Sequence, residues 1–309
     1  MAAVRAIALG LWASALALAA QGEDIFQRVQ RALAASGESE AAVAELRARS
    51  FTRVEARLNS ANGANDGERA ELLALRGAVA FLDGKMAGAE AAFRESEKLR
   101  PLKEEDRFTL AMALVKLSED GQAREVLAHL ADEHGEIAIY WYWLGRLDYD
   151  QRRYKESVEK LQKATDLDAK SPRAWNSLGL AWDMQGRMES ARAAFEKAVV
   201  LNREQTVPSA WPPHNFGYLL FRMGETEAAE KALRESLTYD EKLARTHYYL
   251  GHVLEKEGRQ SEAITEYRSA VAGDTQAAAA CYSLAMLYRK LRREAEAQAM
   301  FAEFRRRKQ

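Results

Sequence analysis

The sequence has few of the residues that form covalent cross-links or metal sites. It contains one cysteine and five histidines among 309 residues. A single thiol cannot form a disulfide within the chain, and so few cysteines and histidines leave little material for a metal centre. The fold must therefore be stabilised by packing. We expect Cys281 to be a small buried hydrophobic residue, with an intermolecular disulfide as the alternative.

Proline and net charge are also scarce. The chain has five prolines and a formal net charge of −1, from 45 basic and 46 acidic residues. This balance gives no general case for binding nucleic acid. Hydrophobic residues make up 48% of the sequence, which excludes a disordered chain. Abundant alanine, leucine, glutamate and arginine favour an all-helical fold.

Only one long apolar run is present, and it lies at the start of the sequence. Arg5 precedes the run Ala6–Ala19, which carries no charge and ends in the small residues Ala17 and Ala19. This pattern predicts a secretory signal peptide over residues 1–19, with an uncleaved membrane anchor as the alternative. We therefore expect a bacterial protein that is exported to the periplasm or secreted. No second run of spanning length follows, so we expect no transmembrane segment in the mature chain.

An internal repeat with a period of about 34 residues, a length typical of paired-helix repeats, dominates the rest of the sequence. Seven units align on a small residue, which is glycine in five of them and alanine in two, at Gly77, Ala111, Gly145, Gly179, Gly217, Gly251 and Ala285. Twelve residues later comes a second small residue, at Ala89, Ala123, Ser157, Ala191, Ala229, Ala263 and Ala297. Four residues further comes a large apolar one, at Phe93, Leu127, Leu161, Phe195, Leu233, Tyr267 and Phe301. This grid predicts pairs of helices that approach closely at the small residues.

Glycine also marks where the first helix of a pair should end. Gly84, Gly186, Gly224 and Gly258 share one register of the repeat. Glycine there is expected to adopt the left-handed conformation that caps a helix.

The unit from Pro172 carries a specific signature in Trp175, Leu178, Gly179, Trp182, Ala191, Phe195 and Ala198. This pattern resembles the tetratricopeptide repeat family; Sel1-like repeats, whose units are slightly longer, fit less well. The resemblance implies an all-α right-handed superhelix of seven to eight helix-turn-helix repeats. It also implies a non-enzymatic scaffold that binds proteins or peptides and needs no cofactor.

The resemblance covers residues 70–309, which we assign to an array of seven repeats. Residues 20–69 fit less well and are interpreted as a capping helix over Ile25–Ala35 and a degenerate repeat over 38–61. The stretch Asn59–Gly67 is rich in asparagine, glycine and aspartate and is expected to be a loop.

One insertion lengthens the period between Asn202 and His214. It carries Pro208, Pro212 and Pro213. The insertion is either a longer connector that stiffens the start of the next helix or a loop that contacts a ligand through Trp211.

We number each unit so that its repeated small residue, such as Gly145 or Gly179, is position 8. Positions 2, 5, 9 and 12 of each first helix then share a face, because residues three and four apart are neighbours on a helix. In the family this face lines the concave groove, and we call it the predicted groove stripe. Its polar and aromatic members are the candidate ligand-binding residues: Tyr142, Arg146, Tyr149, Arg173, Asn176, His214, Tyr218, Arg245, Tyr248, His252, Tyr282 and Arg289.

Tyrosine and arginine suit recognition, because tyrosine offers rigid apolar area and arginine offers planar donors. The alternative is that the tyrosines pack against the next repeat. In the two units upstream, from Ala70 and Glu104, the stripe is more apolar, as if covered by the N-terminal segment.

Other functions find less support in the sequence. No phosphate-binding loop, nucleophile elbow or His-Glu-x-x-His run occurs. His247 and His252 are five residues apart and share a helix face poorly.

The main alternative to a protein-binding scaffold is a carbohydrate-binding or polysaccharide-export accessory protein that uses the same tyrosines as sugar platforms. The basic C-terminal end is typical of a solvated cap, with contact to an anionic surface as the alternative. The partner and the oligomeric state are not specified by the sequence.

Overall fold

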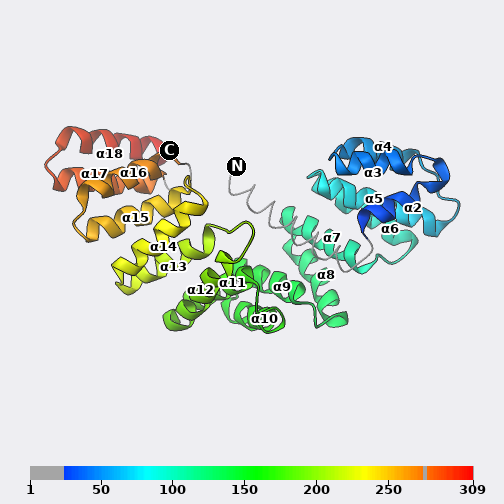
Figure 1. Ribbon diagram of the computed structural model, residues 1–309, viewed down its shortest axis with the longest axis horizontal. Helices are drawn as coiled ribbons and strands as arrows, with labels where there is room; N and C mark the ends of the chain where they lie inside the picture. Colours follow the sequence, from blue (N-terminus) through cyan, green and yellow to red (C-terminus); the bar gives the residue numbers. More distant parts are fainter. Residues whose placement is uncertain (1–23, 274–276, 309) are drawn as a thin grey trace. The chain divides into compact units, whose positions relative to one another are not determined.

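The structure, a computed structural model, describes residues 24–273 and 277–308. The predicted signal peptide, residues 1–19, lies outside the described residues. The described chain forms 17 α-helices and one short 3-10 helix and has no β-strand, which confirms the all-α class (Figure 1). In this part of the chain no helix combines the length and apolar character needed to cross a membrane. The helices are α2 (Ile25–Ala32), α3 (Ser39–Arg47), α4 (Phe51–Ser60), α5 (Asp66–Leu82), α6 (Met86–Leu99), α7 (Glu104–Lys116), α8 (Asp120–Glu133), α9 (Ala138–Asp150), α10 (Tyr154–Leu167), α11 (Pro172–Met184), α12 (Met188–Arg203), α13 (Trp211–Met223), α14 (Thr226–Tyr239), α15 (Ala244–Lys256), α16 (Gln260–Ala272), α17 (Ala277–Lys290) and α18 (Glu294–Lys308), with the 3-10 helix at Ala34–Ser36.

The chain divides into two compact units. The N-terminal unit extends to Leu147, and the C-terminal unit begins at Asp148. In the N-terminal unit α5 pairs with α6 and α7 with α8, and α6 contacts α7. In the C-terminal unit the pairs are α11 with α12, α13 with α14, α15 with α16, and α17 with α18, and each pair contacts the next. Each unit is therefore a stack of helix pairs, as the repeat predicts.

The first helices begin close to the predicted residues, with one exception. The repeat predicts a start at Ala70 for α5, which instead begins at Asp66. The side chain of Asn65 accepts a hydrogen bond from the amide of Glu68 at 3.0 Å, and the Glu68 carboxylate accepts one from the amide of Ala64. This reciprocal cap starts the helix early and shortens the loop expected over Asn59–Gly67.

The grid of small and large residues is confirmed as helix-on-helix packing. A Cβ atom added to Gly179 would lie 2.6 Å from the ring of Phe195, and one added to Gly251 would lie 2.6 Å from the ring of Tyr267. Such distances are shorter than van der Waals contact, so glycine is needed where the two helices of these pairs cross.

The helix-ending register is also confirmed. Gly84, Gly186, Gly224 and Gly258 all have positive φ angles, between 74° and 88°. Ser118, Arg152 and Arg292 occupy the same register in other units and adopt φ angles of 62°, 60° and 59°. The repeat therefore imposes a left-handed residue here even where the sequence has no glycine.

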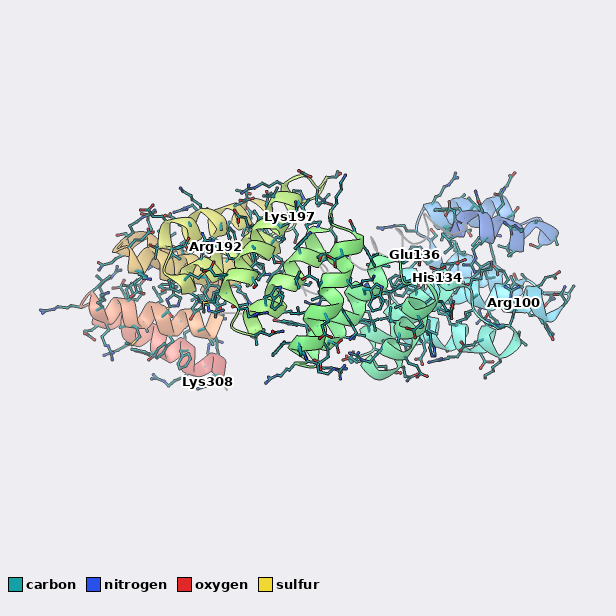
Figure 2. All side chains as sticks on the ribbon, turned by 90° about the horizontal axis from the view of Figure 1, so that it is seen from below. Arg100, His134, Glu136, Arg192, Lys197 and Lys308 are labelled. Atoms are coloured by element: carbon teal, nitrogen blue, oxygen red, sulfur yellow. The ribbon has the colours of Figure 1, made fainter. Side chains whose placement is uncertain are left out.

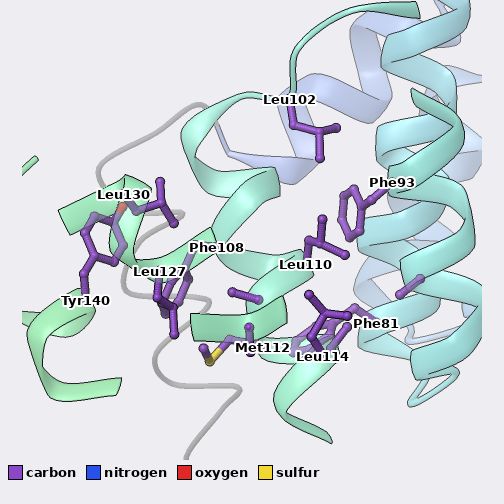
Figure 3. Close-up of a cluster of buried hydrophobic side chains, with 14 of the residues drawn as sticks. Phe81, Phe93, Leu102, Phe108, Leu110, Met112, Leu114, Leu127, Leu130 and Tyr140 are labelled. Carbon is purple, nitrogen blue, oxygen red and sulfur yellow. The ribbon is translucent and has the colours of Figure 1, made fainter. Parts of the chain in front are cut away.

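Each unit has its own apolar core. In the N-terminal unit, side chains from α5 to α9 gather around Phe93, Phe108 and Leu127, all of which are fully buried (Figure 3). Tyr140 closes this cluster with its ring centroid 5.5 Å from that of Phe108. In the C-terminal unit the core centres on Leu250 and Tyr267.

Candidate functional site

The first helices of the C-terminal unit bring most of the predicted groove stripe together. Helix α13 contacts α11 on one side and α15 on the other. Their facing side chains form a run of touching rings, which we call the aromatic ladder: Trp211, His214, Tyr218, Tyr248, Tyr249 and His252.

The ladder is continuous from ring to ring. The centroids of Tyr218 and Tyr249 are 4.4 Å apart, and those of Tyr248 and His252 are 4.6 Å apart. Tyr248 and Tyr249 join the two contacts at 5.2 Å. These distances lie in the range of favourable aromatic pairs, so the ladder links α13 to α15 while Tyr218 and Tyr248 remain partly exposed.

Three cations lie over aromatic rings of α13. Arg245 lies 5.8 Å from the centroid of Trp211, and Lys256 lies 5.6 Å from that of Phe221. Arg222 lies 5.4 Å from the centroid of Tyr218 and also pairs with Asp183 at 2.6 Å. Cation–π contacts of this kind hold the charged groups against the stripe.

His214 is placed inside the structure and is not a surface ligand group. It is 2% exposed, and its Nδ1 lies 2.8 Å from the hydroxyl of Thr246. The Ser236 hydroxyl donates to the carbonyl of Ala210, so it must accept from Thr246, which lies 3.1 Å away. Thr246 must then accept from His214, which fixes the proton on Nδ1. Burial, together with the nearby charge of Arg245, lowers the pKa of His214 to about 3, so the ring is neutral.

His252 is held by a second chain of hydrogen bonds. The hydroxyl of Tyr267 donates to Glu255 at 3.0 Å and lies 2.9 Å from Nδ1 of His252. The Tyr267 oxygen is thus the acceptor for His252, whose Nε2 faces the hydroxyl of Ser283 at 3.4 Å. Burial lowers the pKa of His252. Its ring is therefore oriented by the core, with one edge toward α17.

Other predicted residues lie along the same helices. Asn176 accepts a hydrogen bond from Asn215 at 2.9 Å, linking α11 to α13, and Arg173 is exposed. On α17, Tyr282 is 47% exposed and packs against the rings of Phe301 and Phe304, with centroids 6.0 and 5.4 Å away. Arg289, also on α17, is exposed.

The stripe on α9 is different. Tyr142 is 8% exposed and contacts the ring of Trp143, so it is largely a core residue. Arg146 is half-buried, and Tyr149 packs against Tyr154 with centroids 5.5 Å apart. This is the packing alternative raised for the tyrosines. Tyr142 and Arg146 belong to the N-terminal unit, whereas the aromatic ladder belongs to the C-terminal unit.

In the N-terminal unit, α2 packs against α3 and α5. Its Arg28 is 4% exposed and donates to Glu71 on α5 at 2.8 Å. The same guanidinium forms a two-pronged bond to Asp106 on α7, at 2.9 and 2.8 Å. Burial opposes the charge of Arg28, but these carboxylates raise its pKa, and burial raises the pKa of Asp106. Helix α2 thus contacts the predicted groove stripe of α5 at Glu71 and lies beside the stripe of α7 at Asp106, in both cases through ion pairs.

The proline-bearing insertion folds back on itself. Asn202 is 1% exposed, and its side chain makes two hydrogen bonds to the backbone of Ser209. Its Nδ2 donates to the carbonyl oxygen of Ser209, and its Oδ1 accepts from the backbone N–H of Ser209, both at 2.9 Å. Pro212 and Pro213 are buried in the first turn of α13. These contacts are those of a stiffened connector, although Trp211 at its end does belong to the aromatic ladder.

The described part of the chain has few features that would indicate a metal site or an enclosed small-molecule pocket. No group of three or more histidine, cysteine, aspartate or glutamate residues there can hold a metal ion. An open recess of about 200 Å³ lies between α16, α17 and α18, lined by Leu284, Tyr288 and Met300, away from the aromatic ladder. Cys281 is fully buried, as expected, and burial raises the pKa of its thiol.

Sequence reasoning missed Tyr249, Arg222 and Lys256. Tyr249 stands at position 6, next to the stripe. Its ring contacts Tyr218, a stripe residue on the first helix of the preceding unit, α13. The bond between Asn176 and Asn215 joins the same two positions, 5 and 6, one repeat earlier. A pattern that paired these positions between consecutive units would have found Tyr249.

Comparisons with known proteins agree with this architecture. Family models described as tetratricopeptide repeat match residues 108–172, 145–206, 214–280 and 278–304. A tetratricopeptide repeat protein from Parabacteroides merdae superposes with a TM-score of 0.63 at 17% identity, over 84% of this chain and 99% of that one. The APC/C hetero-tetramer Cut9–Hcn1 gives a TM-score of 0.60 at 20% identity, over 69% of this chain and 42% of that chain.

A curated relative matches a smaller part. Human protein O-mannosyl-transferase TMTC1 is 26% identical over 147 residues, which is 46% of this chain. The matched region spans only 16% of that relative's length. The similarity therefore concerns a repeat segment and not the whole of the larger protein.

Proposed function

This chain belongs to the tetratricopeptide repeat family, and we propose that it binds an extended peptide, or a helix of a partner protein, along the predicted groove stripe of its C-terminal unit. The family and its fold are generally non-catalytic scaffolds for protein interactions. The stripe of α11, α13, α15 and α17 is the surface we assign to the partner. Binding is non-covalent, through aromatic contacts and arginine–carboxylate pairs, without a cofactor.

The observation that carries the proposal is the aromatic ladder. Tyrosine rings that are partly exposed and already fixed by their neighbours lose little conformational entropy when a ligand covers them. Tyr218 and Tyr248 meet this description, because each touches another ring and remains partly exposed. Tyr282 adds the most exposed ring of the stripe, on α17.

The compartment is part of the same proposal. The pattern over residues 1–19 supports export, and the partner is then an exported protein. The N-terminal sequence of the protein purified from an export fraction tests this. A mature chain that begins at Ala20 supports export, and a chain retaining residues 1–19 in the cytoplasmic fraction contradicts it.

The binding surface can be tested by partner capture from the exported fraction. The wild-type chain is compared with the double variant Tyr218→Ala and Tyr248→Ala and with Lys197→Ala, an exposed position on the second helix α12 (Figure 2). We expect one partner to be retained by the wild type and by Lys197→Ala but lost by the double variant. Melting curves and helicity by circular dichroism show whether the double variant is folded.

Capture by all three proteins would place the partner elsewhere on the surface. A double variant that loses binding only in proportion to its melting temperature would make the tyrosines core residues. Binding to a glycan array without any protein partner would favour the carbohydrate alternative.

A further inference from the structure

We propose that the partner segment is acidic, with two carboxylates about five residues apart that pair with Arg245 and Lys256 at opposite ends of α15. This inference rests on the proposed function and names the chemistry of the ligand. It comes from the charges around the aromatic ladder, since the rings alone do not distinguish an acidic peptide from a neutral one.

The carboxylates beside the ladder are already engaged. Asp183 pairs with Arg222, with oxygens 2.7 and 2.6 Å from Nη1. Glu255 accepts from the hydroxyl of Tyr267 and lies 3.9 Å from Lys290. Neither is available to neutralise a further cation without giving up its own partner.

Two cations are left with aromatic contacts only. Arg245 and Lys256 are exposed, and each lies over a ring of α13. Within residues 24–273 and 277–308, neither has a carboxylate partner. A guanidinium that lies on a ring keeps its N–H donors free at its edge, so it can bind a carboxylate without leaving the ring.

The excess charge on this face is therefore positive. Arg289 adds another exposed cation on α17, where it contacts the sulfur of Met286. A partner whose charge complements the face would associate faster and in a preferred register. A basic segment would meet these three cations and would be repelled.

The spacing of the two cations sets the spacing of the acids. Arg245 and Lys256 lie at the two ends of one helix, Ala244–Lys256. At a rise of about 1.5 Å per residue, they are separated by about 16 Å along the helix axis. An extended peptide that runs along the axis of α15 advances about 3.3 Å per residue, so about five of its residues span that distance. The residues between the two acids would lie over Tyr218 and Tyr248.

The test uses the full chain and three short synthetic peptides of equal length, labelled with fluorescein. The first carries glutamates five residues apart with leucine and phenylalanine between them. The second replaces both glutamates by glutamines, and the third places the same glutamates next to each other. Fluorescence anisotropy gives the dissociation constants for the wild type, Arg245→Gln, Lys256→Gln and the control Lys197→Gln.

We expect the first peptide to bind most tightly to the wild type. Arg245→Gln and Lys256→Gln should each weaken it about 3- to 10-fold, while Lys197→Gln leaves it unchanged. The difference between the first and second peptides should shrink as salt is raised from about 0.05 to 0.5 M, because the ion pairs are screened.

Equal binding of the glutamine peptide, still lost in the Tyr218→Ala and Tyr248→Ala double variant, would overturn the acidic partner and leave the proposed function intact. Equal binding of the third peptide would overturn the register. If none of the three peptides binds, this inference fails, and partner capture decides separately whether the proposed function stands.

Discussion

His214 on α13 and Thr246 on α15 share a buried hydrogen bond, with 2.8 Å between Nδ1 and Oγ1. The histidine is neutral because burial lowers its pKa to about 3. In the unfolded chain the pKa is about 6.5. Between these two values the unfolded chain binds more protons than the folded one. The contribution of His214 to stability is therefore fully present above about pH 6.5 and is lost as the pH falls toward 3.

We therefore expect acid to unfold the wild type more readily than a His214→Gln variant. Over pH 6 to 4 the wild-type free energy of unfolding should fall by up to about 1.4 kcal/mol per pH unit more than that of the variant. Urea unfolding followed by tryptophan fluorescence measures this. His129→Gln, at an exposed position, is the control and should keep the wild-type slope. Parallel slopes for all three proteins would mean that His214 can be charged in the folded state.

The buried pair of Arg28 and Asp106 should be costly to break. In an Arg28→Leu variant, the carboxylate of Asp106, which is 2% exposed in the wild type, loses both of its guanidinium bonds. We expect a loss of about 3 to 5 kcal/mol, measured by urea unfolding and by hydrogen exchange in α2 and α5. Gln30→Ala, exposed on the same helix, should change stability little. A double variant with Asp106→Leu as well should recover part of the loss; a loss as large as in the single variant would show that the cost is not the unpaired carboxylate.

The contact between Gly179 and Phe195 makes a further prediction. A methyl group at Gly179 would lie 2.6 Å from the ring, so Gly179→Ala should destabilise the C-terminal unit by about 1 to 3 kcal/mol. Gly121→Ala is the matched control, because no atom lies within 4 Å of a Cβ there. In a helix that change should be neutral or stabilising by up to about 1 kcal/mol. Only Gly179→Ala should lower the melting temperature, and equal shifts in the two variants would contradict the packing.

The left-handed residues offer a stabilising substitution. Arg152 adopts a φ of 60° in the register where other units have glycine. Arg152→Gly should therefore raise the free energy of unfolding by about 1 kcal/mol, and Gly186→Ala, at the equivalent place in the next unit, should lower it by a similar amount. Thermal melts of both variants check this. A destabilised Arg152→Gly would indicate that the arginine side chain contributes more than its backbone costs.

The helical fold could be predicted from the sequence because the repeat unit of about 34 residues occurs seven times. Gly179 and Phe195 show why: a close helix crossing admits only a small residue opposite a large one, so the constraint recurs at fixed spacing. The residues of the aromatic ladder were partly readable for the same reason, since Tyr218 and Tyr248 stand at fixed positions.

The burial and the partners of individual side chains could not be predicted, because they depend on contacts that do not recur with the repeat. Whether a stripe residue is buried depends on its neighbour in the next unit, so His214 and Tyr142 looked equivalent to Tyr248 in the sequence. Arg28 lies outside the repeat altogether, and nothing in the spacing assigns it to Glu71 and Asp106. The repeat pattern does not predict the partner either, because one scaffold can present many surfaces.

The pairing of Arg28 with Asp106 has a consequence for the order in which the chain folds. Hydrogen bonds between neighbouring helix pairs of the C-terminal unit join residues close in sequence, such as His214 and Thr246, 32 apart. Arg28 and Asp106 are 78 apart, which adds about 0.8 kcal/mol to the entropic cost of closing the loop. Helix α2 is synthesised before every other described helix, yet Arg28 can pair with Glu71 only once α5 exists and with Asp106 only once α7 exists. We therefore expect the bonds of Arg28 to be complete only after α5 and α7 have formed.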